Sequence, residues 1–204
     1  MGHRMEDKRD FLFRFIPPDK RKLLKLDNEA FYSVTDQYTA DKISREIKRQ
    51  FPDISTVTDA TACIGGNTYS FSKYFDHINA IELDKLKYEY LCENMKILET
   101  ENVQCLWGDC LELVPSLHQD LVFLDPPWGG PEYKAKTKIT LSLSQIPLLQ
   151  VCEKLKYCCK YLALKVPLNF DLEGFCVGMD LVYKNTELRK MQLLIFKLPP
   201  VNTP

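Results

Sequence analysis

A carboxylate and a large aromatic ring stand three residues apart in Asp125-Pro-Pro-Trp128, directly after the apolar run Leu121–Leu124. Such a run is typical of a buried parallel strand, which places Asp125 at the strand's carboxyl end. Pro126 and Pro127 each fix φ and remove a backbone donor, so the exit from the strand is expected to be stiff. Ligands of open α/β sheets bind at this end of the strands. A carboxylate there can accept hydrogen from an amine, so Asp125, Pro126 and Trp128 are the candidate catalytic residues.

A simpler interpretation of the same segment is a strand end, a surface turn and a half-buried tryptophan. In that case Asp125 would cap a helix or bind backbone groups. We favour the ligand-binding interpretation because Pro-Pro-Trp-Gly-Gly displays an aromatic face rigidly, which a plain turn does not require. A carboxylate or amide followed by Pro-Pro and an aromatic residue is also typical of methyltransferases that act on exocyclic amines of bases.

Asp59, Glu82 and Asp109 stand at or just past the ends of three earlier segments that are predicted to be strands. The carboxyl ends of parallel strands meet at one edge of a sheet, so these acids are expected to lie in register there. One acid in such a place often only caps the next helix, whereas several together indicate a nucleotide-like cofactor. Glu82, at the end of the second strand, is placed to accept ribose hydroxyls, and Asp109 to take an adenine amine.

The loop after the first predicted strand contains Gly65-Gly66, where the backbone can approach a ligand and a helix can begin. The motif Gly-x-Gly-x-x-Gly is absent, which argues against a dinucleotide because its pyrophosphate needs that cradle. S-adenosylmethionine carries no phosphate and does not need it. The predicted cofactor is therefore S-adenosyl-L-methionine.

Hydrophobic periodicity predicts the elements that must position these residues. Strands are predicted over 56–60, 78–83, 103–107, 121–124, 161–166, 180–184 and 191–197, and helices over 36–51, 69–75, 85–98, 142–159 and 170–176. Thr35 is the predicted N-cap of the helix over 36–51. Strand–helix alternation followed by a hairpin predicts an α/β fold, a parallel sheet with an antiparallel edge.

Composition excludes several classes of protein. A net charge of −1 leaves no broad positive field for a long nucleic acid, and no apolar run reaches the length of a membrane span. The charged start is unlike a secretory signal, the eight cysteines include no Cys-x-x-Cys pair, and the three histidines are scattered. We therefore expect no metal site and no membrane partner. The expected location is an intracellular, reducing compartment, nucleus or cytoplasm, and the expected state is a monomer.

The chain resembles the trimethylguanosine synthases, which are RNA cap guanine-N2 methyltransferases. The stretches that carry the resemblance are Leu26-Asp27, Phe31-Tyr-Ser-Val-Thr35, Asp59-Ala60, Gly65-Gly-Asn-Thr68, Ala80-Ile-Glu-Leu-Asp84, Asn94, Gly108-Asp109 and Pro126-Pro-Trp-Gly-Gly-Pro131. Pro-Pro-Trp-Gly-Gly-Pro with Ser-Val-Thr upstream is specific to that family.

The resemblance implies a class I, Rossmann-like methyltransferase domain over 36–204. Its sheet would be mostly parallel and seven-stranded with a terminal antiparallel hairpin, and a short N-terminal arm over 1–35 would close over the active site. Trp128 would stack on 7-methylguanine at the cap of an RNA, with Asn94 and Ser33 near the polar edge of the base. The implied cofactor residues are Thr35, Asp59, Gly65, Glu82 and Asp109. The activity would be methyl transfer to the exocyclic N2 amine of the cap.

Three positions depart from the family pattern. Cys63 stands where the first motif usually has glycine, Asp125 where serine is frequent, and Leu168 where an arginine for the cap phosphates is expected. Aspartate at 125 is typical of amine methyltransferases in general. Phosphate contacts would then come from other cations. The candidates are Lys20, Arg21, Lys22 and Lys165.

Two other functions are compatible with the same residues. One is an amino-methyltransferase acting on adenine or guanine of uncapped RNA or DNA, which acceptance of uncapped RNA would reveal. The other is a degenerate methyltransferase fold that binds caps or protein partners. Cys63 and Leu168 are the features that favour this last alternative, and measurable affinity for S-adenosylmethionine would count against it.

Overall fold

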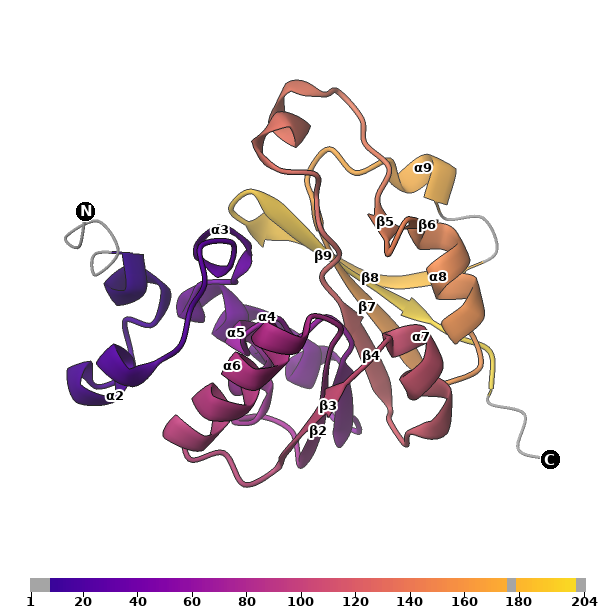
Figure 1. Cartoon of the computed structure of the whole chain (residues 1–204). Coiled ribbons are helices and arrows are strands. Elements are labelled where there is room, and N and C mark those ends of the chain that lie inside the picture. The colour runs from indigo at the N-terminus through magenta and orange to yellow at the C-terminus, as the bar shows by residue number, and fades with distance from the viewer. Residues whose placement is uncertain (1–7, 176–178, 201–204) are drawn as a thin grey trace. The chain divides into compact units, whose positions relative to one another are not determined.

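The structure is a computed structural model that describes residues 8–175 and 179–200. The charged start over 1–7, one of the eight cysteines (Cys176) and the last residue of the helix predicted over 170–176 lie outside the described residues. The chain divides into two compact units, Met1–Cys110 and Leu111–Pro204 (Figure 1).

The first unit contains three parallel strands in the order β3-β2-β1. Their bounds are Thr56–Asp59 for β1, His77–Glu82 for β2 and Val103–Trp107 for β3. The helices are α4 (Gln37–Gln50), α5 (Gly66–Phe71) and α6 (Lys85–Ile97). Figure 1 shows α6 lying along β2 and β3. These strands match the predicted ones to within one residue at each end.

The N-terminal residues of this unit pack onto it through apolar side chains. Residues 8–12 are helical, followed by α2 (Pro18–Leu23) and α3 (Ala30–Ser33). Leu12, Phe13, Ile16, Leu24 and Phe31 are buried in one cluster together with Ile64 of the loop after β1. The predicted arm is therefore held by the same apolar burial that builds a core.

Helix α4 begins one residue later than predicted. Asp36 is its N-cap, and its carboxylate accepts hydrogen bonds from the Thr39 backbone N–H at 3.3 Å and from the Thr39 hydroxyl at 2.7 Å. The prediction of Thr35 as N-cap was wrong because both residue types favour this position and sequence alone did not rank them.

The second unit contains four strands in the order β4-β7-β9-β8. Strand β4 (Leu121–Leu124) pairs in parallel with β7 (Tyr161–Pro167), and β9 (Met191–Lys197) pairs antiparallel with both β7 and β8 (Asp180–Leu188). Short helical segments are α7 (Cys110–Leu113), whose first residue is the last of the first unit, η1 (Val114–Ser116), η2 (Pro131–Ala135) and α9 (Leu172–Phe175). The terminal antiparallel hairpin predicted from the sequence is confirmed by β8 and β9.

The helix predicted over 142–159 is wrong in its first part. Residues Ser142–Leu143 and Ile146–Pro147 form the small hairpin β5–β6, and α8 covers only Leu148–Leu155. The turn residues Ser144 and Gln145 have φ of 49° and 65°, a conformation that glycine and asparagine favour. The usual turn signal was therefore missing. Pro147 was a visible sign of the true helix start, because proline is tolerated at the beginning of a helix and not in its interior.

Candidate functional site

The loops at the carboxyl ends of β1, β2 and β3 are joined by backbone hydrogen bonds. The N–H of Ala62 donates to the Ile81 carbonyl at 2.9 Å, and the N–H of Gly108 donates to the Glu82 carbonyl at 3.1 Å. The register pairs Glu82 with Trp107, which brings Glu82 close to Asp109. The sheet edge predicted as the cofactor site therefore assembles within the first unit.

Glu82 lies at the centre of this edge. Its two carboxylate oxygens each accept one backbone N–H, from Cys63 at 2.8 Å and from Asp84 at 2.8 Å. Desolvation raises the pKa of Glu82 above its ordinary value, and the two backbone hydrogen bonds only partly oppose that shift. The carboxylate is thus oriented by the protein. It can accept further hydrogen bonds because an ionised carboxylate has about four acceptor positions.

Cys63 explains why a glycine suits this loop. Its φ is 50°, the left-handed region that glycine adopts without cost, and its N–H is one of the two that orient Glu82. The Cys63 thiol lies 3.8 Å from the Ser33 hydroxyl, and burial raises the pKa of the thiol to about 11. Cys63 therefore preserves the loop geometry and stays neutral at neutral pH.

Gly65 and Gly66 contact protein where a side chain would stand. Gly65 has a φ of 100°, and a Cβ there would lie 2.4 Å from Met95 Cε. A Cβ on Gly66 would lie 2.8 Å from Val34 Cγ1 and 3.0 Å from the Thr35 carbonyl. Packing against α6 and residues 34–35 therefore requires glycine at both positions, and the expectation that their backbone approaches a ligand stays a prediction.

Three further predicted cofactor residues lie around this edge with different exposure. Asp59 and Thr35 are buried, and the Asp59 carboxylate accepts a hydrogen bond from the Thr68 hydroxyl of α5 at 2.7 Å. Asp109 is partly exposed. Their contacts with a cofactor stay predictions, and Glu82 is the member whose geometry fits ribose hydroxyls.

Asn94 has a clear role inside the first unit. Its side chain accepts from the Lys25 N–H at 2.7 Å and donates to the carbonyls of Lys25 and Ile64, each at 3.0 Å. It is 1% exposed. A contact between Asn94 and a bound base would cost these bonds. Asn94 thus connects the arm to the loop after β1. Ser33, the other residue expected near the base, is exposed, and its hydroxyl donates to the Glu29 carbonyl at 3.1 Å.

In the second unit Asp125 forms an ion pair with Lys165. Parallel pairing sets Leu124 of β4 opposite Leu164 of β7, so the next residues along the two strands are neighbours. The Lys165 ammonium lies 2.5 Å from Asp125 Oδ2, and the two side chains are 4% and 13% exposed. The Lys165 ammonium also lies 5.2 Å from the centre of the Trp128 ring. Lys165, predicted as a phosphate ligand, is therefore engaged by the candidate catalytic loop itself.

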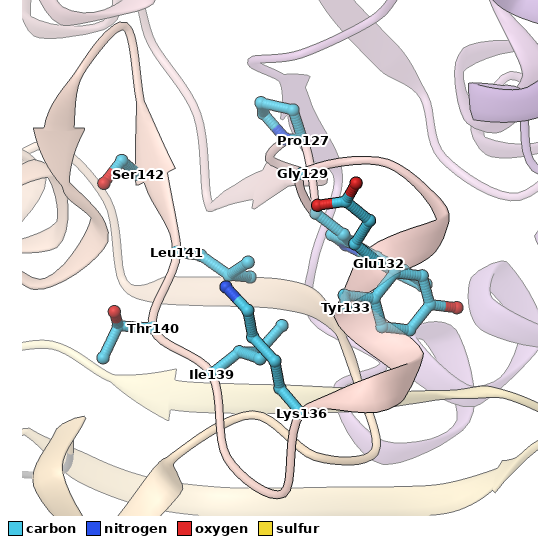
Figure 2. A pocket seen from close by; sticks show the side chains of 10 residues that line it. Pro127, Gly129, Glu132, Tyr133, Lys136, Ile139, Thr140, Leu141 and Ser142 are labelled. Carbon is cyan, nitrogen blue, oxygen red and sulfur yellow. The ribbon is translucent and has the colours of Figure 1, made fainter.

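Trp128 lines an open pocket of about 290 Å³. Its ring meets Tyr133 edge to face at 5.3 Å, and its Nε1 is a buried donor with no partner among the described residues. Glu132 and Lys136 line the same pocket, and Figure 2 shows their charged ends pointing into it. Sequence reasoning missed these two residues, although the alternating lysines over 134–138 were a visible signal.

The cations of the arm are largely engaged by acids of the same unit. The ion pairs are Lys20 with Glu99 at 2.5 Å, Arg21 with Asp10 at 2.8 Å and Lys25 with Glu93 at 3.6 Å. This arrangement weakens the prediction that the arm supplies the phosphate contacts.

Among residues 8–175 and 179–200, no three His, Cys, Asp or Glu side chains gather closely enough to hold a metal ion. No helix of the described chain is both long and apolar enough to cross a membrane.

A parallel sheet with acids at its strand ends, followed by a carboxylate-Pro-Pro-Trp loop and an antiparallel hairpin, defines a class I, Rossmann-like methyltransferase. A solved methyltransferase from Geobacter sulfurreducens has this fold with a TM-score of 0.63 and 14% identity, over 90% of this chain and 91% of that one. The predicted fold class is thus confirmed. The chain belongs to the family of RNA cap guanine-N2 methyltransferases, whose family model matches residues 54–196.

Two curated relatives support the family assignment. An uncharacterized protein of Acanthamoeba polyphaga mimivirus is 37% identical over 69% of this chain. The trimethylguanosine synthase of Schizosaccharomyces pombe is 32% identical over 72% of this chain. The matches span 57% and 64% of the length of these two proteins.

Proposed function

We propose that this chain transfers a methyl group from S-adenosyl-L-methionine to the exocyclic N2 amine of 7-methylguanosine at the cap of an RNA. Membership of the family supports methyl transfer as the class of reaction. The structural observation that chiefly supports the transfer to a base is the grouping of Asp125, Lys165 and Trp128 at the carboxyl end of β4.

The cofactor half of the proposal rests on Glu82. Backbone N–H groups orient its carboxylate, and burial makes the ionised form costly unless donors satisfy it. Ribose hydroxyls are such donors. S-adenosylmethionine supplies an electrophilic methyl group on a sulfonium, and the residues of the chain bind, orient and exclude water.

The base half rests on the loop after β4. Asp125 orients the amine by accepting its hydrogen and stabilises the positive charge that develops on the nitrogen during transfer. Lys165 holds one oxygen of that carboxylate, so it is a positioning residue. Trp128 stacks on the purine and fixes it, and positioning of this kind can supply most of the acceleration. The proton needs no dedicated strong base, because it becomes acidic once the nitrogen is methylated.

The test is methyl transfer to a panel of acceptors with product identification. The panel is a 7-methylguanosine cap dinucleotide, the same dinucleotide without the N7 methyl, uncapped RNA and DNA. The proposal expects a product methylated at N2 of the first acceptor. Methylation of uncapped RNA instead would favour the general amino-methyltransferase, and cap binding without any transfer would favour the degenerate fold.

Two further expectations belong to this proposal. The arm over 1–35 covers the active site of a domain over 36–204, and the apolar packing of residues 12–31 supports a fixed arm. The protein acts as a monomer in the nucleus or cytoplasm, which chromatography and fractionation of cells would test.

A further inference from the structure

The pocket beside Trp128 carries two opposite charges on one turn. Glu132 lies within η2 and Lys136 directly follows it, and both line the pocket with Trp128 and Tyr133. A ligand that fits such a pocket has a positive ring to stack on the indole and a negative group at some distance from that ring. A methylated purine nucleotide has this distribution of charge.

The backbone that presents Lys136 is fixed by one side chain. Asn169 Nδ2 donates to the carbonyls of Tyr133 at 2.8 Å and Lys136 at 2.7 Å, and the N–H of Ile139 donates to the Asn169 carbonyl at 2.9 Å. These bonds fix the backbone from which the Lys136 side chain extends. Figure 2 shows its ammonium reaching into the pocket.

Two nearby lysines, Lys138 and Lys165, are engaged by carboxylates. Lys138 pairs with Asp171 at 3.3 Å and with Glu173 at 2.8 Å, and Lys165 pairs with Asp125. Lys136, in contrast, forms no ion pair with any of the residues that the structure describes. Its ammonium can bind an anion without giving up a carboxylate.

We propose that Lys136 forms an anion subsite of the Trp128 pocket and binds the phosphate chain attached to the base that stacks on Trp128. Glu132 disfavours phosphate near the ring and favours the cationic base, so the two charges orient the ligand. This inference rests on the proposed function and assigns the phosphate contact to a different loop from the arm. Leu168, which is 50% exposed, is the residue before the Asn169 clamp, so Lys136 is held next to the position where the family pattern has a cation.

The test compares 7-methylguanosine with its 5′-triphosphate by calorimetry on the whole chain. We expect the natural protein to bind the triphosphate more tightly than the nucleoside. Lys136→Ala should weaken triphosphate binding roughly tenfold, the loss of one charge-assisted hydrogen bond, and leave nucleoside binding within about twofold. Its triphosphate affinity should also depend less steeply on salt.

Two variants sharpen the comparison. Lys136→Arg should retain the preference for the triphosphate, and Lys136→Glu should reverse it. The matched control is Lys154→Ala, which removes an exposed cation from α8 of the same unit and should change neither ligand's affinity.

The outcomes separate this inference from the proposed function. If the nucleoside binds but Lys136→Ala leaves the ratio of the two affinities unchanged, the anion subsite is wrong and the proposed function stands. If neither ligand binds the natural protein, the proposed function falls and the subsite falls with it.

Discussion

Glu82 is partly buried, and its ionisation therefore affects the stability of the fold. Desolvation raises its pKa above the ordinary 4.5, so the folded chain holds this proton more tightly than the unfolded chain does. The favourable contribution to stability is therefore present below pH 4.5 and is lost as pH rises through the raised pKa. At neutral pH the ionised carboxylate is the form that ribose hydroxyls stabilise.

Cofactor affinity should consequently fall as pH decreases from neutral towards the raised pKa of Glu82. Glu82→Gln should weaken S-adenosylmethionine binding by about 1.5–3 kcal/mol at neutral pH and remove this dependence on pH. Calorimetry between about pH 5 and 8 measures both effects. Equal affinity and an equal pH profile in the folded variant would contradict the assignment of Glu82.

Lys165 should contribute more to the free energy of unfolding than Lys138, which is exposed although it has two ion-pair partners. Lys165→Met removes the ion-pair partner of the Asp125 carboxylate, which is only 13% exposed, and we expect this to cost about 3–5 kcal/mol, whereas adding Asp125→Ser should restore most of that loss. Denaturant unfolding measures the difference. Lys138→Met, which breaks an exposed pair, is the control and should cost less than about 1 kcal/mol. A Lys165→Met protein no less stable than this control would refute the buried pair.

At the scale of elements, Asn94 is the connection between the arm and the loop that orients Glu82. Asn94→Ala removes three hydrogen bonds and leaves buried backbone groups unsatisfied, so we expect a loss of about 2–4 kcal/mol in unfolding free energy. Faster exchange of the Lys25 amide hydrogen should accompany it. Glu93→Ala also removes a contact of Lys25, but an exposed one, and should cost less than about 1 kcal/mol. Similar losses in the two variants would show that Asn94 is not a clamp.

The β5–β6 hairpin contains a turn with unsuitable residues. Ser144 and Gln145 both adopt left-handed conformations, each of which costs roughly 1–2 kcal/mol in a residue with a side chain. Replacing the pair by Asn-Gly should therefore raise the melting temperature, with a gain of about 1–2 kcal/mol in unfolding free energy. The same replacement at Tyr157-Cys158, where Tyr157 is exposed and Cys158 is partly buried, is not expected to stabilise the protein, since neither residue has positive φ there. A lower melting temperature for the hairpin variant would argue against this turn.

The elements themselves were largely predictable because their patterns are local. The buried runs around Val57, Ile81 and Phe123 identified strands, and alternation with helices identified the sheet. The exception was 142–147, where two residues in left-handed conformation replace the usual turn signal. The conformational preferences of serine and glutamine could not reveal the left-handed backbone at 144–145, because the rest of the fold imposes it.

At the scale of the whole molecule, some residues of the site were predictable from local sequence motifs, whereas contacts between distant residues were not. Glu82, Asp125 and Trp128 were predictable because they stand at strand ends or in a short motif. Lys165 was predicted to bind phosphate. Its pairing with Asp125 could not be predicted, because it depends on the β4–β7 register and joins two residues forty positions apart in the chain. The bonds of Asn94 to Lys25 span sixty-nine residues, which no local pattern encodes.

If Trp128 stacks on the cap as proposed, the charge of the base and the ring of Trp128 together predict a requirement for N7 methylation. A 7-methylguanine carries a delocalised positive charge, and an indole face attracts a cation by about 0.5–2 kcal/mol beyond stacking. Trp128→Phe should keep some activity with weaker discrimination, since phenyl attracts cations less. If Trp128 instead only packs under the loop and holds Asp125, this change should slow all acceptors equally.

The deciding measurement is the ratio of methyl transfer rates to a cap dinucleotide with and without the N7 methyl, in the natural protein and in Trp128→Phe. We predict N2 methylation of the N7-methylated cap by the natural protein, almost none of the other cap, and a smaller ratio in Trp128→Phe. An identical ratio in the two proteins, or equal rates on both caps in the natural one, would contradict recognition of a cationic base by Trp128.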